Sequence, residues 1–270
     1  MTSESTELLP APDETPAAAT TMHQDFDSPW KEAITLYFQP FMQLFFPEVH
    51  DWIDWGLPYE FLDAELQKLT SDSSMGKRYA DRLVKVYLQG GAAVWLLIHI
   101  EVQGKADDPF NHRMFQYYYR IHDRHGEVEI ISLAVVTHER DTSGLGTYTA
   151  ERGGYGLRFT FRVHNLQDWR THWHELRARA ATNPFAVVAM AQLVAHQRTK
   201  KPMRQARKRE LIWLLYEHHY ARDDVLQLLR FIDWLIRLPK ELELELQQEL
   251  TALLELSEYK FSLKTECCRS

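Results

Sequence analysis

The stretches ADRLVKV (residues 80–86) and LIHIEVQG (residues 97–104) decide how this chain is interpreted. Each stretch alternates as a strand does, and each carries an acid, Asp81 or Glu101, where a buried strand would prefer an apolar residue. Two carboxylates on neighbouring strands are costly to bury unless a cation or a proton lies between them. The pair therefore decides between a metal site and a solvated sheet face.

The second stretch separates into an apolar face and a polar face. Glu101 and Gln103 lie two residues apart on the polar face, close enough to contact one centre. An oxygen-rich set of ligands with several waters is what Mg²⁺ prefers, and Mn²⁺ is a substitute. If the two strands are neighbours, Asp81 and Glu101 converge on one cation, and Glu65 on a preceding helix supplies a third carboxylate.

The alternative to a metal site is an ordinary solvent-exposed sheet face. Asp81 and Lys85 share a face and could form a surface ion pair, while Glu101 and Gln103 face solvent. Alternation with polar residues is ordinary in antiparallel sheets, so the pattern alone favours the solvated face.

Composition limits the class of protein. The chain has 270 residues, 45% of them apolar and 12% aromatic, which is typical of a globular protein with a sizeable core. The net charge of −7 argues weakly against a dedicated nucleic-acid binder. Its two cysteines are adjacent near the C-terminus, and no apolar run approaches the ~20 residues that cross a bilayer. We therefore expect a cytoplasmic protein with no membrane partner.

The chain divides into four parts. We expect a disordered tail over 1–22, an α/β domain over 23–165, a helical region over 166–260 and a flexible tail over 261–270. Strands are predicted over 81–88, 94–102, 129–137 and 157–163, a helix over 110–123, and a short edge strand over 51–57. A first helix is predicted to begin at Pro29 and to break at Pro40.

Several of these segments together resemble one family. They are FFP (45–47), FLDAEL (61–66), the two opening stretches, RMFQYYYR (113–120), NPF (183–185) and FIDWL (231–235). The chain is similar in them to the Rpn family of recombination-promoting nucleases, also labelled YhgA-like transposases, in the PD-(D/E)XK superfamily. The resemblance favours the metal site over the solvated face.

The resemblance implies a restriction-endonuclease-like αβββαβ core and magnesium-dependent cleavage of DNA. It implies Asp81 as the strand aspartate, Glu101 as the glutamate of the signature and Glu65 as the helix acid. Gln103 occupies the position where the superfamily usually has lysine; it can hold a water but brings no positive charge. Lys85 is a candidate to compensate for that charge.

The helix over 110–123 carries the expected DNA contacts. Met114, Tyr118 and Ile121 are predicted to share its apolar face. Arg113, Gln116, Tyr117 and Arg120 are predicted on the other face. Arg113, Gln116 and Arg120, together with Lys85, are then candidates to contact DNA.

Two further segments allow alternatives. Residues 198–209 hold seven basic residues and no acid, which fits either a nucleic-acid footprint or a solvated helix start. The acidic segment over 241–256 has a leucine seam that would suit a homodimer. The sequence thus leaves two functions open, a metal-dependent endonuclease that promotes recombination and a catalytically weak module that binds DNA or protein.

Overall fold

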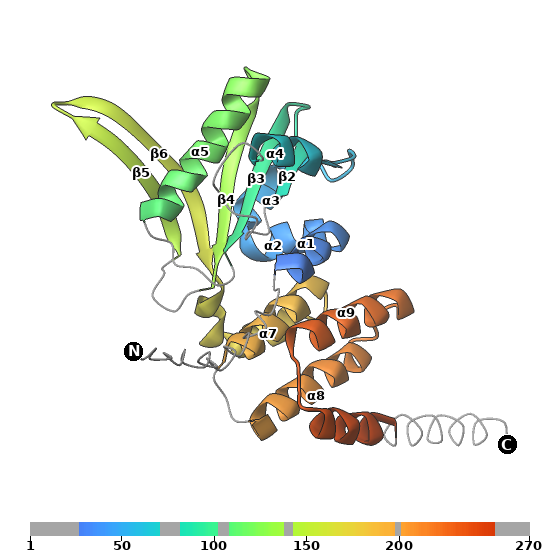
Figure 1. Cartoon of the computed structure of the whole chain (residues 1–270). Coiled ribbons are helices and arrows are strands. Elements are labelled where there is room, and N and C mark those ends of the chain that lie inside the picture. The colour runs from blue at the N-terminus through green and yellow to red at the C-terminus, as the bar shows by residue number, and fades with distance from the viewer. Residues whose placement is uncertain (1–26, 71–81, 102–107, 138–142, 198–200, 252–270) are drawn as a thin grey trace, which may run out of the picture.

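The computed structural model of the chain describes residues 27–70, 82–101, 108–137, 143–197 and 201–251 (Figure 1). An α/β part comes first and a helical part follows. The helices of the first part are α1 (Asp27–Leu36), α2 (Phe38–Phe45), α3 (Pro47–Trp52), α4 (Asp63–Thr70) and α5 (Asp108–His125). The second part has η1 (Leu166–Arg170), α6 (Trp173–Arg179), α7 (Pro184–His196), α8 (Lys201–Glu217), α9 (Arg222–Leu235) and a further helix over 240–251.

The strands form one mixed six-stranded sheet in the order β1-β2-β3-β4-β6-β5. Their bounds are β1 (Glu60–Phe61), β2 (Arg82–Tyr87), β3 (Ala93–Glu101), β4 (Glu129–Val136), β5 (Gly144–Arg152) and β6 (Tyr155–Asn165). The β3/β4 and β4/β6 pairs are parallel and the other pairs are antiparallel. The predicted α/β class, followed by a helical C-terminal part, is confirmed at this level.

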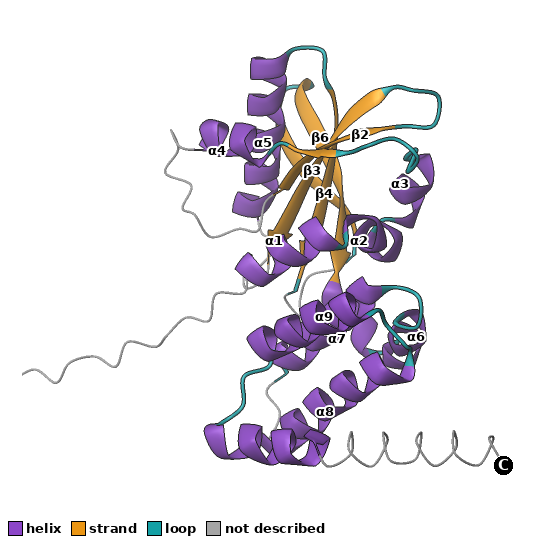
Figure 2. Cartoon of the chain, turned by 90° about the vertical axis from the view of Figure 1, so that its right-hand side faces the viewer, coloured by secondary structure: helices purple, strands orange, loops and turns teal. Residues whose placement is uncertain are grey.

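Strand alternation gives the sheet two buried faces. Leu83 and Leu97 pack with Leu66 of α4 and with Tyr117 and Ile121 of α5. Figure 2 shows α4 and α5 together on this side of the sheet. The alternate residues of the same strands, such as Val84, Val86, Leu96 and Ile98, join a larger cluster with α1–α3 and α7. Both faces are therefore covered, which fits the near-continuous apolar runs of β3 and β4.

The first helix does break, but at Tyr37 rather than at the predicted Pro40. The helix α1 begins at Asp27 and ends at Leu36, and α2 begins at Phe38. Pro40 lies in the first turn of α2, where a missing backbone N–H removes no intrahelical hydrogen bond. For the same reason Pro47 begins α3.

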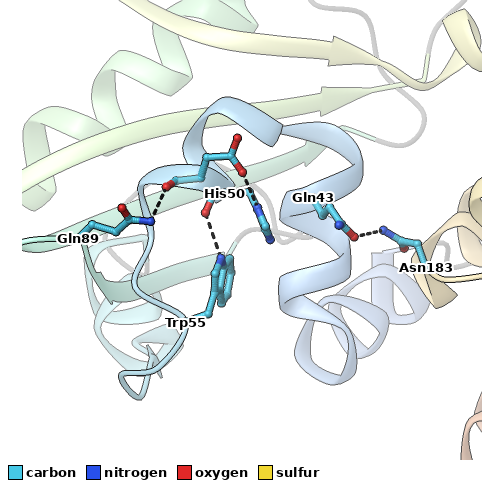
Figure 3. A network of polar contacts seen from close by, with 6 residues as sticks. Gln43, His50, Trp55, Gln89 and Asn183 are labelled. Atoms are coloured by element: carbon cyan, nitrogen blue, oxygen red, sulfur yellow. Dashed lines mark hydrogen bonds and ion pairs between the residues drawn. The ribbon is translucent and has the colours of Figure 1, made fainter.

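The predicted edge strand over 51–57 is wrong. Asp51 and Trp52 belong to α3, and only Ile53 forms an isolated bridge, to Leu88. Two side-chain hydrogen bonds hold this segment instead (Figure 3): Trp55 Nε1 donates to the His50 carbonyl at 3.0 Å, and Gln89 Nε2 donates to the Asp51 carbonyl at 3.0 Å.

One buried cluster joins the α/β part to the helices that follow. It runs without interruption from α1–α3 through β2–β4 to α7, α8 and α9. Trp30 of α1 donates a buried 2.9 Å hydrogen bond to Gln192 of α7. Asn183, just before α7, donates to the Pro40 carbonyl at 2.9 Å. It also donates to Gln43 at 3.2 Å (Figure 3). The regions over 23–165 and 166–260 thus share a core.

The acidic helix over 240–251 packs back onto the chain. Leu246 is 2% exposed and belongs to the main cluster, and Leu250 packs against that cluster. The described part of the leucine seam is therefore used within the chain. Among the described helices none is both long and apolar enough to cross a bilayer.

Candidate functional site

The two strands that carry the signature acids are neighbours. They pair antiparallel, and Arg82 of β2 lies opposite Ile98 of β3. Asp81 directly precedes β2 and lies outside the described residues, as does Gln103, which follows β3. Glu101 is the last residue of β3; its backbone lies opposite Val136 of β4, and its side chain is not among those described. The expectation that the strands adjoin is confirmed, and the convergence of the acids stays a prediction.

The polar face of β3 is the one covered by α4 and α5. Leu97, on this face, packs with Leu66 and Tyr117. Position 101 belongs to the same face as Leu97, because residues four apart in a strand lie on one side. Glu101 is at the C-terminal end of β3. The parallel strands β4 and β6 end at the same edge of the sheet, at Val136 and Asn165.

Glu65 lies on the helix that covers this face. It is half-buried in α4 and directly precedes Leu66, which packs against Leu83 of β2 and Leu97 of β3. The predicted helix acid, Glu65, therefore lies on a helix that packs over β2 and β3, the strands next to which the other two acids occur.

The helix α5 places its predicted DNA-contact residues along one flank. Arg113, Gln116 and Arg120 are half-buried on the flank turned toward α4. The opposite flank, with Phe115 and Tyr118, packs against β5 and β6. The polar flank therefore belongs to the same side of the sheet as Glu65.

Tyr117 was predicted on the polar flank and is instead buried at 3% exposure. It lies between Met114 and Ile121 on the helix, which are both buried too, so its ring falls on the apolar stripe. Tyr118, predicted in that stripe, is half-buried beside Phe159, with ring centroids 5.0 Å apart.

Lys85 of β2 lies far from the position of Glu101 on the neighbouring strand β3. It is opposite Trp95, and Glu101 is six residues further along β3, which corresponds to about 20 Å. Its Nζ lies over the Tyr87 ring, 5.4 Å from the centroid. Lys85 shares the face of Leu83, as expected, but this separation removes it as a replacement for the missing lysine at position 103.

Arg82 fixes the start of β2, the residue after Asp81. Its side chain is only 12% exposed and forms an ion pair with Asp63, the first residue of α4. Its Nη2 donates to the Lys31 carbonyl of α1 at 2.6 Å and to Thr35 Oγ1. Burial lowers the pKa of this guanidinium from its ordinary value. The start of β2 is thus held to α1 and to α4 at once.

Three of the seven basic residues over 198–209 form ion pairs within the described part of the chain. Lys208 is 2% exposed at its side chain and lies 2.9 Å from Asp233 and 2.5 Å from Glu243. Arg209 pairs with Glu249 at 2.6 Å, and Arg207 pairs with Glu210 at 2.7 Å. The acidic helix over 240–251 therefore pairs with two of the seven basic residues that suggested a nucleic-acid footprint.

The sequence reasoning missed β5 and the hairpin that it forms with β6. Residues Gly153 and Gly154 join the strands in a two-residue turn, with φ angles of 61° and 85°. Positive φ at both central residues is the signature of a tight hairpin turn, so this pair of glycines was the available signal. The exposed tip of the hairpin presents Arg152, Tyr155 and Arg158.

Within the ranges that the structure covers, no group of three or more histidine, cysteine, aspartate or glutamate side chains could hold a metal ion. Asp81 and Gln103 lie outside those ranges. Comparisons with family models, with curated proteins and with solved structures give no match. The class that fold and site define is an α/β protein with a mixed sheet, and membership of the Rpn family stays a prediction.

Proposed function

We propose that this chain is a metal-dependent DNA endonuclease that hydrolyses phosphodiester bonds and promotes recombination. The observation that supports it most is the antiparallel β2–β3 pair, which ends beside Asp81 on one strand and at Glu101 on the other. Paired strands lie about 4.8 Å apart, so two acids at adjoining strand ends can share one cation.

The order of elements supports an αβββαβ core. In this proposal α1–α3 form the first helical layer, β1, β2 and β3 are the three consecutive strands, α5 is the second helix and β4 is the last strand. The helix α4 is then an insertion between β1 and β2. The antiparallel β1–β2–β3 run followed by a parallel β4 needs a crossover, which α5 provides.

The donor set fits Mg²⁺, or Mn²⁺ in its place. Asp81 and Glu101 are the direct ligands, and Glu65 supports the site directly or through water; carboxylate oxygens are the ligands that these hard cations prefer. A bound cation would polarise the phosphate and lower the pKa of a bound water.

The remaining residues orient water and DNA. Gln103 holds the attacking water by hydrogen bonds. Hydrolysis forms a bond between that water oxygen and phosphorus and breaks one bond from phosphorus to a deoxyribose oxygen. Arg113 and Arg120 on the α4-facing flank of α5 contact phosphates, because guanidinium groups bind them with paired N–H donors.

Plasmid cleavage tests this function. We expect the purified protein to cleave supercoiled plasmid in Mg²⁺ or Mn²⁺ and to stop in EDTA. Asp81→Asn and Glu101→Gln remove a negative charge while keeping side-chain shape, and each should lower the rate at least ~100-fold. Asp123→Asn, an exposed acid on α5, is the matched control and should keep the rate. Cleavage that survives both site variants would refute the proposal.

A catalytically inactive module that binds DNA or protein is the second candidate. It is favoured by Gln103, which lacks the positive charge of lysine, and by the ~20 Å that separates Lys85 from position 101. Calorimetry with Mn²⁺ separates the two candidates. Binding that Asp81→Asn abolishes supports the nuclease, and absence of binding at millimolar Mn²⁺ supports the module.

A further inference from the structure

The hairpin of β5 and β6 extends past the body of the sheet as a two-stranded ribbon. Only the last part of β6, from Arg162 to Asn165, pairs with β4. The rest of β6 pairs with β5 alone, and Figure 1 shows the two strands projecting away from the other elements. We call residues 149–158 the ribbon tip; all ten are exposed.

The base of the ribbon is held firmly. Tyr148 stacks on Phe115 of α5 with centroids 5.0 Å apart and planes at 17°, and Phe159 packs against Tyr118. Arg162 pairs with Glu48 of α3 at 2.8 Å. The base of the ribbon is therefore fixed to α5 and α3, and the tip projects from a packed part of the sheet.

The tip carries an arginine on each face of the ribbon. Arg152 lies opposite Tyr155, and Arg158 lies opposite Thr149, three residues earlier on β5. Because alternate positions of a strand point to opposite sides, Arg152 and Arg158 emerge on opposite faces. In the part of the chain that the structure describes, neither guanidinium lies in an ion pair, and Glu151 is the one acid of the tip.

Two more tip residues are apolar or aromatic and strongly exposed. Tyr155 is 84% exposed beside the turn and Leu157 is 41% exposed. Both side chains lie on the Arg152 face, because Tyr155 pairs with Arg152 and Leu157 pairs with Ala150. A partner that presents negative charge on both sides of the ribbon is complementary to an arginine on each face.

We propose that the ribbon tip enters a groove of duplex DNA. This inference rests on the proposed function, since it takes DNA as the ligand. A two-stranded ribbon fits the major groove, whose phosphate walls lie on both sides of an inserted element. Arg152 then contacts one wall and Arg158 the other. Tyr155 and Leu157 share the face of Arg152, and Tyr155, beside the turn, lies at the end that enters the groove. The tip extends about 16 Å per strand, twice the ~8.5 Å depth of the groove.

Fluorescence anisotropy with a labelled 30-base-pair duplex in EDTA tests the ribbon without cleavage. We expect Arg152→Ala/Arg158→Ala to weaken binding roughly tenfold or more. Loss of two phosphate contacts should also make the slope of log K against log salt concentration less steep by about 1.8. Tyr155→Ala should weaken binding and leave that slope unchanged, because it removes no charge.

A matched control removes two exposed arginines from the helical part. Arg222→Ala/Arg237→Ala should change neither affinity nor slope. Arg152→Lys/Arg158→Lys should keep the slope, and thermal melting should show that all variants fold. An equal effect of the control pair, or an unchanged slope in the ribbon variant, would overturn the proposal. So would a change of oligomeric state in the ribbon variant with DNA affinity unchanged, since the ribbon would then bind a second copy.

The ribbon and the nuclease proposals fail in different ways. Metal-dependent cleavage, combined with a salt slope of DNA binding that is unchanged in Arg152→Ala/Arg158→Ala, would refute the ribbon proposal alone. Ribbon-dependent binding without any cleavage would refute the nuclease alone. A wild-type protein that binds no duplex in EDTA at low salt refutes the ribbon.

Discussion

Arg82 at the start of β2 forms an ion pair with Asp63 at the start of α4. The pair joins the strand that follows Asp81 to the helix that carries Glu65. The guanidinium also donates to the Lys31 carbonyl and lies over the Phe61 ring, 5.1 Å from its centroid. One side chain therefore contacts α1, β1 and α4.

We expect Arg82→Met to lower the free energy of unfolding by about 3 kcal/mol, because it leaves the Asp63 carboxylate without its partner. Urea unfolding would measure the change. The double variant Asp63→Asn/Arg82→Met should cost less than the sum of the single changes. Arg177→Ala, which breaks an exposed pair with Glu217, is the control and should cost less than about 1 kcal/mol. Equal costs for both arginines would contradict this role.

Lys208 tests whether the basic run serves the fold or DNA. We expect Lys208→Ala to cost about 2–3 kcal/mol, because it leaves a cavity where the buried stem lay. Lys208→Met keeps that stem, and its acid partners Asp233 and Glu243 are partly exposed and stay hydrated, so it should cost less than about 1.5 kcal/mol. Neither variant should alter the salt slope of DNA binding. Equal losses for Ala and Met would show that the charge pairing dominates.

Gln103 tests the chemistry of the proposed site. If the missing positive charge limits the rate, Gln103→Lys should raise the cleavage rate roughly tenfold, because an ammonium group stabilises negative charge that develops in the transition state. Lys85→Gln should leave the rate unchanged, since Lys85 lies about 20 Å along the sheet from position 101. Single-turnover cleavage assays measure both. A slower Gln103→Lys enzyme would show that the amide itself is needed.

His164 makes stability depend on pH. Burial, and then the charge of Arg162, lower the pKa of this imidazole from its ordinary value. Its ring packs against Phe46, with centroids 5.2 Å apart. Because the unfolded chain then binds the proton more readily, stability should fall as the pH drops through about 6.5 toward the lower folded pKa.

Urea unfolding at pH 7.5, 6.5 and 5.5 measures this loss. His164→Gln should remove part of the pH dependence, and His174→Gln, at an exposed position, should not. Identical pH profiles for the wild type and His164→Gln would contradict the prediction.

The strands with strong apolar alternation could be predicted from the sequence. The expected strands over 81–88, 94–102 and 129–137 correspond to β2, β3 and β4, because their runs of Val, Ile and Leu fill two covered faces. The strand β5 could not be found in the same way. It lies at the sheet edge and contains Gly144 and Gly146, and the Phe161 ring lies across Gly146 so closely that a Cβ there would be 2.3 Å from it. Its composition reflects that tertiary contact and not a local strand preference.

The sequence predicted which helix or strand each candidate site residue belongs to, but it did not predict the distances between those residues. Periodicity assigned Glu65 to a helix and Glu101 to a strand, and the structure confirms both. Strand register was the missing quantity, because one sequence does not say which residue lies opposite Lys85. Helix phase also mattered: Tyr117 and Tyr118 lie about 100° apart around the helix, and both are aromatic, so composition did not say which of them enters the core. The ion pairs of Lys208 and Arg209 could not be predicted for a different reason, since their partners Glu243 and Glu249 lie 35 and 40 residues later in the chain.

The shared core of α1–α3 and α7 has a consequence for the way this protein can evolve. Phe41 and Phe45 lie against Phe185, with ring centroids 5.0 and 6.0 Å apart. The apolar surfaces of α2 and α7 therefore bury each other. The helices after residue 165 are therefore not an independent module. Exchanging them by gene fusion, or deleting them, would expose this shared core. A descendant that lost them would have to replace its aromatic residues at 41 and 45 with polar ones in the same lineage.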